Sequence, residues 1–231
     1  FPLKNKIIIV GSGNAAMSAG IAALANGSDV TILEKAPEKL SGGNTKYTAG
    51  AMRFCFNGME DLIPLLQNPN DSRLERTEFG CYSETQFAND LLSFNEGQPL
   101  SDEQKILVNQ SYDAIKWLAS HNIKFEPIYE RQSFKKDGKH VFWGGLALSA
   151  ANEGIGLFEQ ERDAFLGLGG EILYEMEVTN LSYAEGQVDG VYVEDEYYAA
   201  DAVVLACGGF EASDEMRAKF VGENWRDAKV R

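Results

Sequence analysis

The sequence predicts an α/β fold built on a parallel sheet, and three observations lead to that prediction. A β-branched run, Ile7 to Val10, stops at Gly11, as a strand buried on both faces of a parallel sheet would. A segment of small residues from about Asn14 to Ala25 favours a helix that packs closely on such a sheet. A second apolar run, Val30 to Leu33, completes the strand, helix, strand order that neighbouring parallel strands require.

The chain is long enough for a substantial core and too acidic to favour a nucleic-acid partner. Its 231 residues are 44% hydrophobic and 11% aromatic, which suffices for one sizeable core or two small ones. The formal charge of −14, from 21 Lys and Arg against 35 Asp and Glu, repels nucleic acid and anionic membranes. Because no run approaches the ~20 apolar residues that span a bilayer and the first residues lack a secretory pattern, we expect a cytoplasmic protein without a transmembrane segment.

The cysteines and histidines give little support to metal or nucleophilic chemistry. Cys55, Cys81 and Cys207 are odd in number and widely spaced, so we expect reduced thiols and neither a disulfide framework nor a metal knuckle. The chain has only His121 and His140, with no HExxH motif for zinc and no GxSxG motif for a catalytic serine. We therefore predict no metal site and interpret both histidines as structural.

The middle of the chain predicts an irregular stretch followed by two helices. Residues 55–80 carry the turn-forming sequence Asn-Pro-Asn-Asp and no clear period, so we expect an exposed loop there. The stretches that start at Ser83 and Ser101 each place the Ser-x-x-Gln pattern of a capping box ahead of apolar residues at helical spacing. These two stretches should form helices whose apolar faces belong to the core.

The C-terminal part predicts one more helix, a meander and a final strand. The helix should run from Ile155 to Leu168 and end at the glycine pair that follows. Residues 171–201 alternate short strand-like runs with turns, which indicates an antiparallel meander. The apolar run from Ala202 to Ala206 predicts one last buried strand, which ends abruptly at two glycines.

The turn after the first strand carries a dinucleotide-binding fingerprint. GSGNAA, residues 11–16, is a G-x-G-x-x-A variant between a predicted strand and a predicted helix, the context that the fingerprint requires. Gly11 would make the tight turn, Gly13 would let the backbone approach a pyrophosphate, and the helix N-terminus would attract the phosphates. Glu34 ends the second strand, where a carboxylate accepts both hydroxyls of an adenosine ribose. The sequence thus predicts a site for an ADP moiety and leaves NAD and FAD open.

Two further segments bear on the choice of nucleotide. Ser41 to Met52 is a Gly-rich loop, whereas a nicotinamide dehydrogenase would normally continue here into another helix and strand, so that class is disfavoured. Residues 200–213, ADAVVLACGGFEAS, predict a strand that returns to the first Gly-rich turn, at the carboxyl end of the sheet where ligands bind in open α/β folds. Taken alone, an ordinary exit from strand to loop explains the last segment equally well.

Together these three segments resemble the flavoprotein family of succinate dehydrogenases and fumarate reductases. That family binds FAD with an N-terminal Gly-rich turn, a GGN-[ST] loop and a late A-[TC]-GG strand. Within it, GSGNAAMSAGIAA, LEKAPEKLSGGNTKYT, HVFWGG and GGFEASDEMRAKFVGENWRDAKVR look like segments of FAD-dependent tricarballylate dehydrogenases. The resemblance implies a Rossmann-like FAD-binding domain, with a parallel sheet and an antiparallel meander, that is incomplete at the C-terminus.

The resemblance also implies which residues contact FAD. The pyrophosphate would lie on Gly11, Ser12, Gly13, Asn14, Ala15 and Ala16, and the adenosine ribose between Glu34 and Lys35. The ribityl chain would run along Gly42, Gly43, Asn44 and Thr45, and the flavin ring near its N5 would meet Ala49, Gly50 and Ala51. Val178 would meet the adenine through its backbone, and Cys207, Gly208 and Gly209 would close over the middle of the cofactor.

The same resemblance implies an FAD-dependent dehydrogenase or reductase with a dissociable cofactor. Respiratory members attach FAD covalently through a His in the GGN loop, and no His precedes His121, so the FAD should be non-covalent. The reaction would transfer a hydride between flavin N5 and a small polycarboxylate such as tricarballylate or succinate and fumarate, with an electron-transfer partner. The catalytic Arg and His groups of the family are expected beyond residue 231, so none is assigned here. Lys46, Arg53, Arg226 and Arg231 are interpreted as solvated or salt-bridged side chains.

These expectations divide the chain and leave rival functions open. We expect a nucleotide-binding βαβ segment at 5–54 and a mostly helical insertion at 55–140. A helix, meander and return strand should occupy 141–212, and a capping domain should begin at 213–231. The rivals are a related flavin dehydrogenase for another unsaturated acid or a ketone, a flavin-binding fragment without turnover, and a nicotinamide dehydrogenase.

Overall fold

The structure, a computed structural model, describes residues 4–229 and divides them into two compact units. The first unit comprises residues 4–23, 27–44 and 171–229, and the second comprises residues 24–26 and 45–170. The chain therefore begins the first unit, builds the second and returns to complete the first. The four-part division predicted above stays a prediction.

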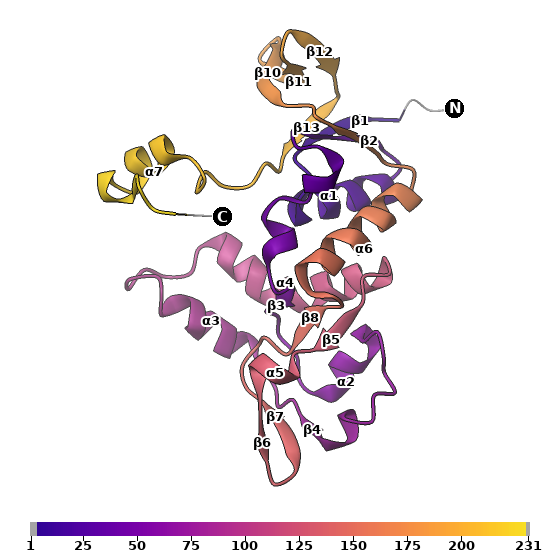
Figure 1. The fold of residues 1–231 in the computed structure, drawn as a ribbon, viewed down its shortest axis with the longest axis vertical. Coiled ribbons are helices and arrows are strands. Elements are labelled where there is room, and N and C mark those ends of the chain that lie inside the picture. The colour runs from indigo at the N-terminus through magenta and orange to yellow at the C-terminus, as the bar shows by residue number, and fades with distance from the viewer. Residues whose placement is uncertain (1–3, 230–231) are drawn as a thin grey trace. The chain divides into compact units, whose positions relative to one another are not determined.

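A four-stranded parallel sheet forms the centre of the first unit, as predicted. Its strand order is β13-β1-β2-β9, and β13, β1 and β2 lie side by side in Figure 1. The strands are β1 (Lys6–Val10), β2 (Asp29–Glu34), β9 (Glu171–Tyr174) and β13 (Ala202–Leu205), and helix α1 (Asn14–Ala25) connects β1 to β2. Ile8 and Ile9 are buried on opposite faces of the central strand, which confirms the expectation for a β-branched run in a parallel sheet.

The register of this sheet brings three strand ends to one edge. Val10, the last residue of β1, pairs with Leu33 on one side and with Leu205 on the other. Because these strands are parallel, the connections that leave them all emerge at the same, carboxyl edge of the sheet. The Gly-rich turn, the residues after Glu34 and the residues after Leu205 are thereby placed together.

The predicted antiparallel meander is present, and it packs on one face of the sheet. Its strands are β10 (Val178–Ala184), β11 (Gln187–Val193) and β12 (Glu196–Ala199), paired in that order. Val191 and Ala200 are buried in one cluster with Ile8, Val10 and Leu33, so the meander and the sheet share an apolar core.

The last strand is exposed where burial was expected. β13 lies at the edge of the sheet, and its Val204 and Leu205 side chains are 36% and 60% exposed. The prediction of a buried strand was wrong, because an apolar run does not distinguish a central strand from an edge strand. Beyond it, helix α7 (Asp214–Phe220) is anchored by the buried Arg217 guanidinium, which donates to the carbonyls of Glu211, Trp225 and Arg226.

Three helices of the second unit were predicted, and two of them begin with the predicted capping boxes. In α3 (Glu84–Leu92) and α4 (Asp102–Ser120), the Ser83 and Ser101 side chains accept the N–H groups of Gln86 and Gln104. The glutamine side chains accept the serine N–H groups in return, so each box is complete. The third helix, α6 (Glu153–Gly167), matches the predicted helix within its end residues.

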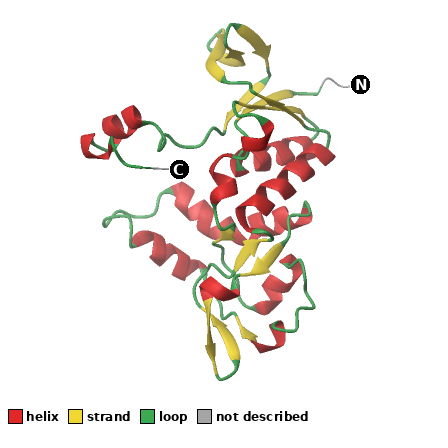
Figure 2. Ribbon diagram, viewed as in Figure 1, coloured by secondary structure: helices red, strands yellow, loops and turns green. Residues whose placement is uncertain are grey.

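Short sheets that the sequence did not predict complete the second unit. One contains β3 (Ala51–Met52), β8 (Leu148–Ala150) and β5 (Phe125–Pro127), and the other β4 (Thr77–Glu78), β7 (Lys139–Phe142) and β6 (Ser133–Lys136). The short helices of this unit are α2 (Met59–Leu62) and α5 (Tyr129–Gln132), and its 3-10 turns lie at Ile63–Leu65 and Leu74–Arg76. The 3-10 turns at Glu38–Leu40 and Glu223–Trp225 belong to the first unit, and the one at Gly43–Tyr47 spans the division between the units along the chain. Figure 2 distinguishes the short strands (yellow) from the longer helices (red).

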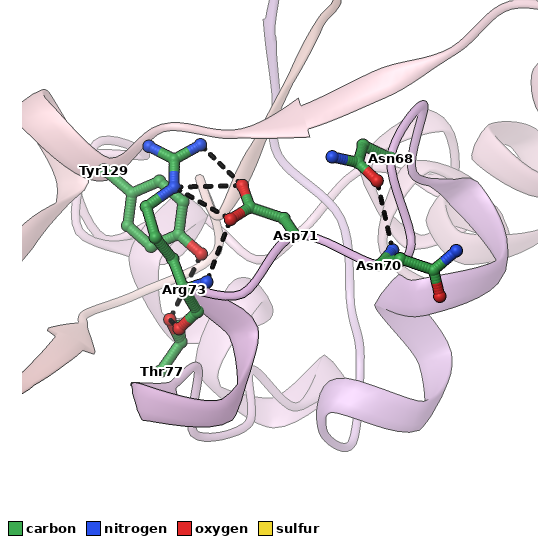
Figure 3. Close-up of polar contacts among 6 residues, drawn as sticks. All are labelled: Asn68, Asn70, Asp71, Arg73, Thr77 and Tyr129. Atoms are coloured by element: carbon green, nitrogen blue, oxygen red, sulfur yellow. Dashed lines mark hydrogen bonds and ion pairs between the residues drawn. The ribbon is translucent and has the colours of Figure 1, made fainter.

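Most of the apolar residues in the stretch at 55–80 are buried, so the prediction of an exposed loop was wrong for them, although more than half of the residues in the stretch are exposed. Leu62, Leu65, Leu66, Leu74 and Phe79 all belong to the main apolar cluster of the second unit. The turn chemistry itself was read correctly, since Asn68 Oδ1 accepts from the Asn70 N–H and Asp71 Oδ1 from the Arg73 N–H (Figure 3). Irregularly spaced leucines have no period that could reveal their burial.

A side-chain cluster holds this stretch in place (Figure 3). Arg73 donates to both Asp71 oxygens, at 2.9 and 3.1 Å from Nε and 2.6 Å from Nη2, and its guanidinium lies 4.3 Å from the centre of the Tyr129 ring. The Tyr129 hydroxyl lies 3.1 Å from Thr77 Oγ1. The hydrogen bonds from Arg73 lower the pKa of Asp71, so the pair stays charged.

Candidate functional site

The Gly-rich turn requires glycine at position 11 for two independent reasons. Gly11 has a φ of +98°, which disfavours any residue with a Cβ. A Cβ there would also lie 2.6 Å from the carbonyl oxygen of Ala206, at the exit of β13. The Gly11 N–H donates to Leu33 O at 2.8 Å. Gly11 therefore contacts the C-terminal end of β2 and lies close to the residue that follows β13.

The Ser12 hydroxyl connects the Gly-rich turn to Glu34 and to the Gly-rich loop at Gly42. Ser12 Oγ donates to Glu34 Oε2 and accepts the Gly42 N–H at 3.0 Å. The other carboxylate oxygen, Glu34 Oε1, accepts the Ala36 N–H at 2.8 Å. Ser12 and Glu34 are both buried, and Ser41 beside them is buried with its hydroxyl on Glu38 O. The motif predicted Glu34, whereas the parts played by the Ser12 hydroxyl and the Ala36 N–H depend on folded geometry that no sequence pattern indicated.

Small, exposed residues surround this buried centre and leave room for a ligand. Asn14, Ala15, Gly43 and Cys207 are exposed or lie at the surface, and Lys35 is exposed next to Glu34. A Cβ at Gly43 or Gly208 would meet no other atom of the described chain within 4 Å, and their φ angles are +51° and +76°.

The start of α1 has the electrostatics that a phosphate needs. Gly13 O accepts the Met17 N–H at 3.0 Å, which begins the helix directly after the turn, and its first turn contains no acidic residue. The positive end of the helix dipole is thus not neutralised by its own side chains. Ala16 is buried, as the fingerprint expects for close packing of helix and strand, although Ala15 is exposed. The residues present fit a nucleotide with a pyrophosphate.

The return strand and the Gly-rich loop are joined beyond this centre. The Ala206 N–H donates to Val10 O at 2.9 Å, and the Asn44 side chain donates to Glu211 Oε1 at 2.7 Å. Cys207, Gly208 and Gly209 are exposed between these two contacts. Val178 lies apart from them, half-buried at the start of β10, where it pairs with Val193.

The remaining predicted residues belong to the second unit. Gly50 is buried with a φ of +63°, and a Cβ there would lie 2.6 Å from the backbone carbon of Glu153. Thr45 and Ala49 are half-buried and Ala51, which opens β3, is exposed. The predicted contacts of Ala49, Gly50 and Ala51 with the flavin ring, and of Thr45 with the ribityl chain, stay predictions.

The basic residues set aside above have ordinary partners where the structure describes them. Arg53 Nη1 lies 3.0 Å from the Tyr82 hydroxyl and 3.3 Å from Asp90, and Arg226 forms an ion pair with Glu223. Burial and the hydrogen bond to Asp90 raise the pKa of Tyr82. Lys46 lies 5.4 Å from the centre of the Phe158 ring, and Arg231 lies outside the described residues.

The described part of the chain contains no metal centre and no membrane span. No group of three or more His, Cys, Asp or Glu side chains within residues 4–229 is arranged to hold a metal ion. No helix within the same residues combines the length and the apolar character needed to cross a bilayer.

Comparison with known proteins identifies the family. The FAD binding domain family matches residues 6–226. A fumarate reductase (cytochrome) from Shewanella frigidimarina is 26% identical over 220 residues, which is 92% of this chain and 34% of that protein, so the chain spans about a third of its relative.

Two solved structures share the fold. A 3-ketosteroid-Δ4-(5α)-dehydrogenase from Rhodococcus jostii RHA1 aligns with a TM-score of 0.67 at 19% identity, covering 95% of this chain and 49% of that one. The E. coli quinol fumarate reductase aligns with a TM-score of 0.61 at 16% identity, covering 92% and 34%. The predicted α/β fold, the FAD cofactor and the likeness to fumarate reductase flavoproteins are confirmed, while the closeness to tricarballylate dehydrogenases stays a prediction. The chain belongs to the FAD binding domain family.

Proposed function

We propose that this chain forms the adenosine- and pyrophosphate-binding part of an FAD-dependent oxidoreductase. The observation that carries the proposal is the junction at Ser12, where one buried hydroxyl joins the Gly-rich turn to Glu34 and to the Gly42 N–H. This junction brings the turn, Glu34 and the Gly-rich loop together at the sheet edge where α/β folds bind nucleotides.

Each part of this junction has a role in holding the cofactor. The backbone of residues 11–16 would bind the pyrophosphate at the positive end of α1, and Glu34 would accept the ribose hydroxyls, with Lys35 beside it. Gly42, Gly43 and Asn44 would line the cofactor on one side, and Cys207, Gly208 and Gly209 on the other. When bound, FAD supplies hydride chemistry at its flavin ring.

We further propose that the cofactor is not covalently attached and that the substrate is a small polycarboxylate such as tricarballylate, succinate or fumarate. No histidine lies in the Gly-rich loop or anywhere before His121, so the chain offers no imidazole for a flavin linkage there. The substrate proposal is supported by the sequence relative named as a fumarate reductase. A related unsaturated acid or a ketone is the alternative substrate.

The visible absorption spectrum of the purified protein tests the cofactor. We expect flavin bands that move to the supernatant after acid precipitation, and bands that stay with the precipitate would overturn the non-covalent assignment. A colourless protein that takes up no added FAD would overturn the proposal as a whole.

Flavin redox state tests the substrate. Tricarballylate or succinate should bleach the flavin of the complete protein without oxygen, and fumarate should restore the colour of the reduced form. If a ketone or another unsaturated acid reoxidises the flavin and none of the polycarboxylates acts, the alternative substrate class replaces the one proposed here.

A further inference from the structure

The Ser12 hydroxyl is buried and has both of its hydrogen-bonding roles occupied. Ser12 is 2% exposed, and its oxygen accepts the Gly42 N–H while its hydrogen points to Glu34 Oε2. A hydroxyl has one hydrogen to donate, an N–H can only donate, and an ionised carboxylate can only accept. The direction of these two hydrogen bonds is therefore fixed, from Gly42 through the Ser12 hydroxyl to Glu34. The hydroxyl has no hydrogen left to donate to a phosphate.

Glu34 is held at both oxygens before any ligand arrives. Oε2 accepts from Ser12 and Oε1 accepts the Ala36 N–H at 2.8 Å, and the residue is only 8% exposed. An ionised carboxylate has about four acceptor sites, so each oxygen can still accept one more hydrogen bond. The two remaining sites are thus fixed in direction, and a rigid acceptor pair costs less free energy to order on binding.

We infer that Ser12 is a positioning residue that sets the selectivity of the nucleotide site for an intact ribose diol. It does so by fixing the plane of the Glu34 carboxylate and not by contacting the phosphates. The inference rests on the proposed function, since it assumes that an adenosine ribose reaches Glu34. The Ser12 hydroxyl would then orient Glu34, whereas the backbone of the same turn would bind the pyrophosphate.

The chain offers a matched control in Ser41. Ser41 is 1% exposed and lies next to Gly42 in the same loop, but its hydroxyl donates to Glu38 O at 2.7 Å instead of to Glu34. Ser41→Ala therefore removes one buried hydroxyl and one hydrogen bond from the same region without changing what Glu34 accepts.

The experiment compares ADP with 2′-deoxy-ADP and 3′-deoxy-ADP on flavin-free protein by calorimetry. In the parent protein we expect ADP to bind at least about tenfold more tightly than either deoxy analogue, the loss typical of a hydrogen bond to a charged group. Ser12→Ala should reduce this ratio to about threefold or less, while Ser41→Ala should keep it. Adding Ser12→Ala to Glu34→Gln should lower the ratio no further than Glu34→Gln alone, because both act through one carboxylate.

The outcomes separate this inference from the proposed function. If Ser12→Ala binds ADP and keeps the parent ratio, or if Ser41→Ala lowers the ratio equally, Ser12 has no positioning role. If the parent protein binds neither ADP nor FAD, the proposed function itself fails. Should Ser12→Ala not fold, as judged by thermal unfolding, the near-isosteric Ser12→Cys replaces it, because a thiol is a weak donor and should lower the same ratio.

Discussion

The two units of this chain are stabilised by different means. The second unit has a large cluster of buried residues in which Phe54, Phe56, Tyr82, Phe87 and Phe125 are almost completely inaccessible. The buried cluster between sheet and meander in the first unit is smaller and aliphatic, with Ile8, Val10, Leu33, Val191 and Ala200. At the ligand-facing edge of the first unit, glycine conformations and a few buried hydrogen bonds take the place of large side chains.

The small residues at the edge of the first unit are explained by the proposed need to leave room there for a cofactor. Aromatic side chains contribute most of the apolar area that a small core can bury, but they would fill the space next to the Gly-rich turn. Residues such as Gly43, Ala15 and Gly208 leave that space open. We therefore expect the second unit to be sensitive to loss of volume, and the first unit to be sensitive to backbone geometry and to ligand.

The largest effect should come from Phe125→Ala in the second unit. Phe125 is fully buried, and removing its ring should destabilise that unit by about 4 kcal/mol through lost burial and the cavity left behind. Urea unfolding followed by hydrogen exchange in α4 and α6 would measure it, with Phe94→Ala, at an 84% exposed site, as the control. Equal losses of stability from the two substitutions would contradict the claim that the second unit depends on its buried aromatic core.

Gly11→Ala should cost somewhat less stability but abolish tight FAD binding. The positive φ and the contact with Ala206 O together should destabilise the first unit by about 3 kcal/mol. Gly27→Ala is the control, because Gly27 has a φ of +86° but no other atom of the described chain within 4 Å of its Cβ position. That variant should lose about 1 kcal/mol and keep its affinity for FAD, as measured by fluorescence titration.

A smaller effect is expected from Tyr82→Phe, and it should depend on pH. The Tyr82 hydroxyl donates to Asp90 at 2.6 Å and accepts from Arg53, and because both partners are half exposed its loss should cost about 1 kcal/mol.

Burial first, and then the bond to Asp90, raises the pKa of Tyr82 above the ordinary tyrosine value. The unfolded chain therefore releases this proton at lower pH than the folded chain does. Stability that is complete below pH ~10 should decline as the pH rises further. Unfolding midpoints between pH 8 and 11 should show a shallower alkaline decline for Tyr82→Phe, and an unchanged slope would remove this explanation.

Local patterns predicted the elements that a short stretch of sequence specifies by itself. The run Ile7–Val10, the small-residue segment from Asn14 and both capping boxes are such patterns, and each element formed where it was expected. Strands β3, β5 and β8 have only two or three residues each and pair across long stretches of chain, as Ala51 does with Ser149. No period can exist in so few residues, so these sheets were not predictable.

The candidate site also contains residues that the sequence predicted and contacts that it could not predict. Gly11 and Glu34 were predictable because the fingerprint fixes their spacing along the chain, and a G-x-G turn has few other uses in that context. The contacts from Ser12 to Gly42 and from Asn44 to Glu211 join segments far apart in sequence, so only the fold reveals them. The sequence did not predict that Leu205 is exposed, because the sequence of a strand does not show which strands lie beside it.

The central claim is that the open, small-residue edge of the first unit binds FAD, and two cysteines test it directly. Cys207 lies at that edge and Cys81 lies in the second unit, and both are exposed, while burial raises the pKa of the Cys55 thiol and should make it slow to react. Alkylation by N-ethylmaleimide would be followed by mass spectrometry of the three peptides, with and without FAD. With FAD at roughly 100 times its dissociation constant, we expect Cys207 to react at least about tenfold more slowly and Cys81 to react at an unchanged rate. Equal rates at Cys207 with and without bound FAD would contradict the assignment of this edge as the cofactor site.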